Sequence, residues 1–184
     1  MSLTLATLFP GLLLIALGAA VFAGTPAIVA IFKAMPRSRA ATFVFFYGGA
    51  AWFLNIVWNL SAADFGEHRL LLFSGFFLVT ILAFFYVPDF LAVRGLCILT
   101  LLAGWPVLMS GYMNFDHPQV NFLKVFVYAC IVLALWLGAQ PWRLRDFFQW
   151  LFATSGRPRT IGGALLGYGL LLCVVAFTYG KAAQ

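Results

Sequence analysis

The chain has 184 residues, of which 64% are hydrophobic and only 9% are charged. A soluble domain carries roughly 25% charged residues, so this composition excludes an ordinary water-soluble protein and predicts an all-α membrane protein. The formal net charge is +6, but the Lys and Arg residues lie in short segments between apolar blocks and form no single basic face, which disfavours a nucleic-acid partner.

Six apolar blocks are long enough to cross a bilayer, which takes about 20 helical residues. We predict a single transmembrane domain over residues 1–184, with spans at about 3–32, 40–60, 70–87, 95–112, 120–137 and 161–179. The first block is longer than a bilayer requires, and we expect Gly24, Thr25 and Pro26 to bend it. No basic residue precedes this block, so we expect it to be a retained span and no cleaved signal.

Small residues recur on one face of the first block and of the last block. In the first block they are Ala16, Ala20 and Gly24, and in the last block they form the GxxxG pair Gly163 and Gly167. Faces of this kind let helix backbones approach each other closely in lipid. The sequence leaves open whether they pack within this bundle or against another protein.

The second block contains two asparagines, Asn55 and Asn59, which lie four residues apart and therefore share a helix face. Trp52 and Trp58 are close to them in the sequence. An amide at membrane depth needs hydrogen-bond partners. We therefore expect Asn55 to face the protein interior and to bond to another helix. These four residues are candidates for helix packing, and a ligand contact is the alternative.

The two histidines, His68 and His117, fall in connections on the predicted outer side of the bundle, near Asp64, Glu67 and Asp116. A metal site with nitrogen and carboxylate ligands would form if the two loops converged. Neither loop contains a recognised ligand motif, so we predict no metal and interpret both histidines as solvated interface residues. Without a histidine deep in any span, a bis-histidine haem in the membrane is also disfavoured.

The segment 142–152, between the fifth and sixth spans, is expected to form a short amphipathic helix. Its apolar residues at positions 144, 147, 148 and 151 follow the i, i+3, i+4, i+7 pattern of one helix face. About eleven residues are too few to cross a bilayer, so we expect this helix to lie in the headgroup plane. It is either an anchor for its loop or a docking surface for lipid or a partner, and the docking candidates are Trp142, Arg143, Arg145, Phe147, Phe148 and Leu151.

The basic residues predict the orientation of the bundle. Eight of them fall in the first, third and fifth connections, whereas three fall on the other side. Positive residues favour the cytoplasmic side, so both termini are expected outside, in a bacterial-type inner membrane or a plasma membrane.

Every charged residue lies in a connection or within about one turn of a span end, whereas ion carriers usually place ionisable residues at membrane depth. The sequence contains no P-loop, dinucleotide fingerprint, nucleophile elbow or zinc-binding helix. An enzyme or an autonomous pump is therefore disfavoured, and the residues identify no cofactor.

Three functions are consistent with these features. The leading hypothesis is a non-catalytic accessory or scaffolding subunit of a larger integral membrane complex, with membrane lipids and partner subunits, or a second copy, as its contacts. The alternative is a small transporter or binding protein for a lipid, quinone or other hydrophobic molecule, which would use the many phenylalanine rings and the Asn55 region. A membrane enzyme that uses His68 and His117 would require their two loops to converge.

Overall fold

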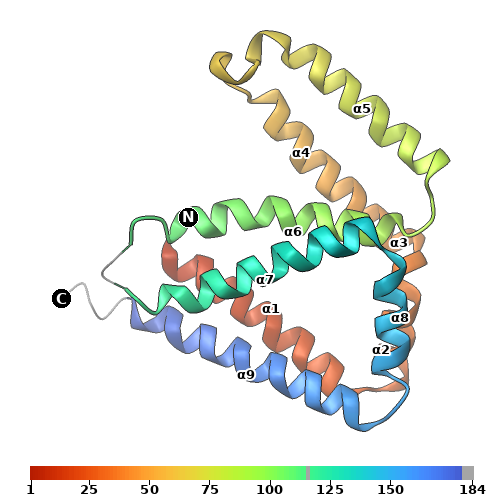
Figure 1. Cartoon of the computed structure of the whole chain (residues 1–184), viewed down its shortest axis with the longest axis vertical. Coiled ribbons are helices and arrows are strands. Elements are labelled where there is room, and N and C mark those ends of the chain that lie inside the picture. Colours follow the sequence, from red (N-terminus) through yellow and green to blue (C-terminus); the bar gives the residue numbers. More distant parts are fainter. Residues whose placement is uncertain (115–116, 180–184) are drawn as a thin grey trace. The chain divides into compact units, whose positions relative to one another are not determined.

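The computed structural model describes residues 1–114 and 117–179, and these residues contain helices but no strand (Figure 1). The α-helices are α1 (Leu3–Ala23), α2 (Pro26–Ala34), α3 (Arg39–Thr42), α4 (Gly48–Trp58), α5 (Arg69–Tyr86), α6 (Leu91–Ser110), α7 (Val120–Ala139), α8 (Trp142–Leu151) and α9 (Gly156–Thr178). The short elements are the 3-10 helices η1 (Met35–Arg37), η3 (Ala62–Asp64) and η4 (Gly66–His68) and the π-helix η2 (Phe43–Tyr47). The all-α prediction is confirmed.

Among the described residues, six helices are long and apolar enough to cross a membrane. They are Leu3–Ala23, Arg39–Trp58, Gly66–Tyr86, Leu91–Ser110, Val120–Ala139 and Gly156–Thr178. This confirms the predicted number of helices of spanning length. The second of them combines α3, η2 and α4, so it contains one π-helical segment within an otherwise α-helical span.

The first apolar block, predicted as one bent span over residues 3–32, forms two separate helices. Gly24 ends α1 in the left-handed conformation (φ 54°), and its N–H donates to the carbonyl oxygen of Ala20 at 3.2 Å. Glycine adopts this conformation at little steric cost. Pro26 then begins α2, where its missing N–H costs no helical hydrogen bond. The first helix of spanning length is therefore only 21 residues long.

The chain divides into two compact units. Unit 1 consists of Met1–Lys33, Ala103–Leu133 and Arg145–Gln184, and unit 2 consists of Ala34–Leu102 and Ala134–Leu144. The boundaries fall within α2, α6, α7 and α8, so each unit contains part of these helices. The single transmembrane domain stays a prediction.

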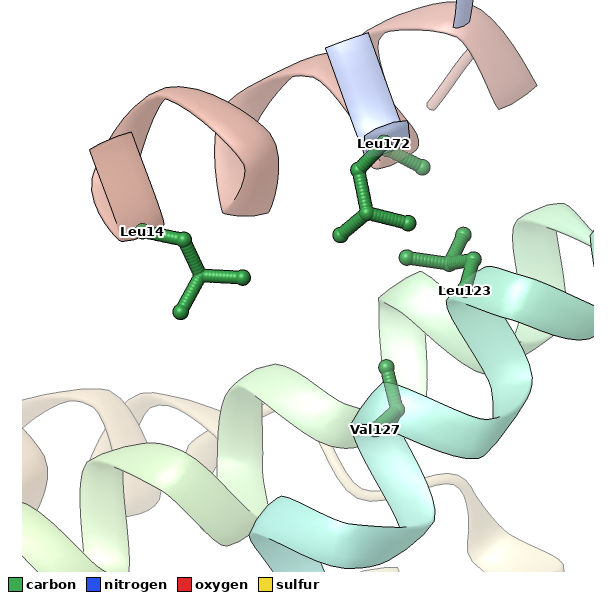
Figure 2. Close-up of a cluster of buried hydrophobic side chains, with 5 residues drawn as sticks. Leu14, Leu123, Val127 and Leu172 are labelled. Atoms are coloured by element: carbon green, nitrogen blue, oxygen red, sulfur yellow. The ribbon is translucent and has the colours of Figure 1, made fainter. Parts of the chain in front are cut away.

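Unit 1 is built on the packing of α1 against α9, which lie side by side (Figure 1). Leucines from both helices meet side chains of α7 in an apolar core. Figure 2 shows Leu14 of α1 and Leu172 of α9 directed toward Leu123 and Val127 of α7. All four side chains are buried. The buried residues of this core are aliphatic, and the partly buried rings of Phe126 and Tyr168 pack against them.

Unit 2 contains the hairpin of α4 and α5 and the first part of α6. Aromatic rings join the two helices of the hairpin, because Phe53 meets Phe76 edge to face at 4.9 Å between ring centroids and Trp58 meets Phe73 at 5.3 Å. No residue of α5 is buried. Within unit 2, this apolar helix therefore stays largely exposed outside its contacts with the second span.

Glycine also permits a close contact inside unit 2. A Cβ atom added to Gly95 of α6 would overlap the backbone of Phe46 in the π-helix η2. Only a residue without a side chain fits there. This contact fixes α6 against the aromatic π-helical turn of the second span.

Candidate functional site

Two glycines in each of α1 and α9 allow these helices to pack backbone to backbone. The four residues are Gly11, Gly18, Gly162 and Gly169. A Cβ atom at position 162 would lie 2.5 Å from the backbone nitrogen of Phe22, and one at position 18 would lie 2.7 Å from that of Leu166. Both distances are too short for a real Cβ atom. The seven-residue spacing of each pair (11 and 18; 162 and 169) is visible in the sequence and is the signal that could have identified these residues.

The predicted GxxxG pair, Gly163 and Gly167, lies on a different face of α9 and is open. A Cβ atom added to either glycine would meet no atom within 4 Å. Thr160 and Ala164, which extend the same small-residue surface, are exposed. We call these four residues the open α9 face. On the first helix, Ala16 of the predicted small-residue series is also exposed. The close packing inside the chain thus uses other glycines, and the described residues leave the open α9 face uncovered.

A groove of about 540 Å³ runs along α4 and α5 in unit 2. It is lined by Ala51, Leu54, Asn55, Trp58, Phe73 and Phe77. Two of the four predicted candidates in this span, Asn55 and Trp58, therefore take part in it, whereas Trp52 and Asn59 are not among its lining residues. Apart from the amide of Asn55, the walls are apolar and largely aromatic.

The prediction that Asn55 faces the interior and bonds to another helix is wrong. Asn55 is exposed, and its partner is Asn59 on the same helix. The Nδ2 of Asn59 donates to the main-chain oxygen of Asn55 at 2.7 Å and to its Oδ1 at 3.3 Å. The four-residue spacing that places both amides on one face also lets Asn59 donate to Asn55, so part of the hydrogen-bonding capacity of the two amides is met within α4.

Residues 142–152 were predicted to be helical, and α8 covers all of them except residue 152. Phe148 and Leu151 are buried, and the ring of Phe148 packs edge to face on Phe32 of α2 at 5.3 Å between centroids. Part of the apolar face expected to enter lipid is therefore covered by the chain itself. Trp142 and Phe147 stay exposed, at 45% and 41%. The location of α8 at a membrane interface stays a prediction.

The two arginines of α8 interact with different kinds of partner. Arg145 forms an ion pair with Asp146, with 2.7 Å between Nη2 and Oδ1. Arg143 donates from Nε to Oε1 of Gln140 at 2.9 Å, and its guanidinium lies 5.5 Å from the centre of a Trp136 ring. Arg143 is the more suitable contact for an anionic headgroup, because its neighbours in these contacts are neutral.

His68 belongs to unit 2 and His117 to unit 1. The ring of His117 meets Tyr179 edge to face at 5.3 Å between centroids, and its Nδ1 is 3.5 Å from Nε2 of Gln119. Asp116, predicted to lie beside His117, is outside the described residues. Within residues 1–114 and 117–179, no three His, Cys, Asp or Glu side chains are grouped so that they could hold a metal ion.

No protein family model matches the chain, no curated protein matches it, and no solved structure matches its fold. The open α9 face, the groove of α4 and α5, and the surface of α8 are therefore the features on which a functional proposal can be built.

Proposed function

We propose that the chain crosses a membrane six times and serves as a non-catalytic accessory or scaffolding subunit of a larger integral membrane complex. The observation that carries this proposal is the open α9 face. Gly163 and Gly167 create a surface on which another helix backbone can lie, and no described residue of unit 1 covers it.

Two glycines at open helix positions lower the stability of the folded chain. Glycine in a helix is less stable than alanine by roughly 0.5–1 kcal/mol, because it loses more backbone freedom on folding. At positions 162 and 169 this cost is offset by the close approach of α1. At positions 163 and 167 no described residue of unit 1 offsets it. In lipid, small-residue faces associate helices through close packing and not through the hydrophobic effect. A helix of another subunit packed on Gly163 and Gly167 therefore explains these glycines better than contact with lipid does.

Purification in mild detergent, without crosslinking, tests the proposal. The native chain should bring down at least one membrane protein, or a second copy of itself, in a fixed stoichiometry. The double variant Gly163→Leu/Gly167→Leu should lose it, because two leucines would hold the partner backbone away from α9. The matched control is Gly48→Leu/Gly75→Leu, since both of these glycines are equally open.

Two results would count against an accessory subunit. One is a monodisperse single chain across several mild detergents. The other is a partner that stays bound to the α9 double variant as firmly as to the control.

A second function, the binding of a hydrophobic molecule, is favoured by the groove of α4 and α5. Its aromatic walls suit a flat or chain-like ligand, and the amide of Asn55 could orient a polar group. Organic extraction of the purified protein followed by mass spectrometry should then reveal one defined compound. Ala51→Leu, which narrows the groove, should abolish its retention. An extract that contains only bulk lipid in both proteins would remove this candidate.

A further inference from the structure

A second groove, of about 350 Å³, lies in unit 2 between the beginning of α6 and the end of α7. Its walls include Cys97 and Leu101 of α6 and Ala134 and Gly138 of α7, and its one charged lining residue is Arg94. The volume is within the range of roughly 300–1,000 Å³ that is typical of small-molecule sites. The groove thus combines one cationic end with apolar walls.

The guanidinium of Arg94 is distinguished by its contacts within the described part of the chain. Among the described residues its side chain makes no hydrogen bond and no ion pair, although it is only partly exposed. Two other arginines of unit 2 are engaged differently: the guanidinium of Arg37 lies 4.9 Å from the centre of the Phe90 ring, and Arg143 is bonded to Gln140. A partly buried cation at the end of an apolar groove is complementary to an amphiphile with an anionic head.

We infer that this groove binds an anionic phospholipid, with the headgroup phosphate on Arg94 and one acyl chain along the apolar walls. Guanidinium is well suited to phosphate, which it can bind with two parallel hydrogen bonds. Arg94 also lies in the first turn of α6, where the helix dipole favours a negative group. The occupant is a lipid and not a soluble phosphate, because the apolar walls suit an acyl chain and offer nothing to a hydrated ion.

The inference rests on the membrane-spanning part of the proposed function and not on the partner subunit. The orientation predicted from the basic residues puts Arg94 on the cytoplasmic side, where anionic lipids are concentrated. Lipid binding is measured on the single purified chain, whereas partner binding is measured by co-purification. Failure of one can therefore be told apart from failure of the other.

The test is native mass spectrometry of the purified chain in detergent, with phosphatidylglycerol or phosphatidylcholine added at equal concentration. Arg94→Gln removes the charge, and Gly138→Leu fills the groove. A Cβ atom at position 138 would lie 3.9 Å from that of Cys97, an ordinary contact, so the larger side chain should be accommodated. The controls are Arg159→Gln, an exposed arginine of unit 1, and Gly75→Leu, an open glycine of α5.

The native chain should bind phosphatidylglycerol in preference to phosphatidylcholine. Arg94→Gln should reduce this preference about threefold to tenfold, which is the range expected for one charge-assisted contact at a partly exposed site. Gly138→Leu should reduce binding of both lipids, while the two control variants should behave like the native chain. If Arg94→Gln does not purify as a folded protein, Gly138→Leu against Gly75→Leu still decides the question.

Three results would overturn the inference. The first is a native chain without preference for the anionic lipid. The second is equal loss in Arg94→Gln and Arg159→Gln, which would assign the preference to total charge. The third is unchanged binding in Gly138→Leu.

Discussion

Neighbouring glycines in α9 lie in opposite environments, so their substitution by alanine should have opposite effects. Gly162→Ala places a methyl group 2.5 Å from the backbone of Phe22 and should lower stability by about 1–3 kcal/mol, as overpacking usually does. Gly163→Ala meets open space and should leave stability unchanged or raise it by up to about 1 kcal/mol. Thermal unfolding in detergent, followed by circular dichroism, measures both. Equal tolerance of the two substitutions would show that α1 and α9 do not pack backbone to backbone.

The amide pair of α4 gives a second prediction for single residues. Asn55 is exposed and bonded to Asn59 one turn away. A surface pair at this spacing contributes roughly 0.2–0.5 kcal/mol, so Asn55→Leu should change stability by less than about 1 kcal/mol. The same thermal measurement applies. A loss of several kcal/mol would instead indicate a buried partner on another helix, as the sequence alone suggested.

These residues show where sequence reasoning about the candidate site stopped. The GxxxG pattern at Gly163 and Gly167 indicated correctly that a helix backbone can approach, but such a pattern does not say which helix supplies the opposite surface. The contact inside the chain uses Gly162 and Gly169 instead. Similarly, the desolvation argument for Asn55 assumed that its partner had to come from another helix, and it overlooked the amide four residues away.

The sequence predicted the helix α8 well. It did not predict the residues that pack against this helix. Its 3.6-residue period is a local property, so Trp142–Leu151 could be recognised from a few residues. The cover that α2 provides for Phe148 depends on a tertiary contact with Phe32, which the period of α8 alone does not reveal. The first block differed for another reason: hydropathy suggested one span, but it does not report the left-handed backbone of Gly24, which ends α1 and divides the block.

The contact between α8 and α2 can be tested with two adjacent phenylalanines. Phe148 is 6% exposed and Phe147 is 41% exposed. Phe148→Ala should therefore destabilise the protein by about 3 kcal/mol, since it leaves a cavity beside Phe32. Phe147→Ala should cost no more than about 0.5 kcal/mol, as is usual at an exposed position. Similar losses in unfolding temperature for both variants would argue that α8 does not pack on α2.

Spin labels placed along α8 test its predicted location in the headgroup plane. Labels at positions 142 and 147, which are exposed on the helix, should report the depth of the membrane interface. The depth along the segment should vary with the helical period of about 3.6 residues. A profile without this period, or labels fully in water, would contradict an interfacial helix.

For the whole molecule, the hydropathy pattern along the sequence was enough to predict six helices of spanning length, because long apolar blocks are a strong signal that needs no tertiary information. Orientation is a weaker inference that rests on the positive-inside rule. In a variant without Cys97, Cys130 and Cys173, a cysteine at Ser2 should react with an impermeant reagent from outside. A cysteine at Ser155 should react only after the membrane is opened. Labelling of position 155 from outside would reverse the predicted orientation.

The central claim is that the open α9 face is covered by another protein in the native membrane. A photo-crosslinking amino acid at position 163, introduced in the cells that make the protein, tests this claim most directly. Position 132 in α7, where the native valine is 65% exposed, serves as the lipid-facing control. We predict one discrete protein adduct from position 163 and none from position 132. Lipid adducts alone at position 163, or the same adducts at both positions, would contradict the proposal that this chain is a subunit of a larger complex.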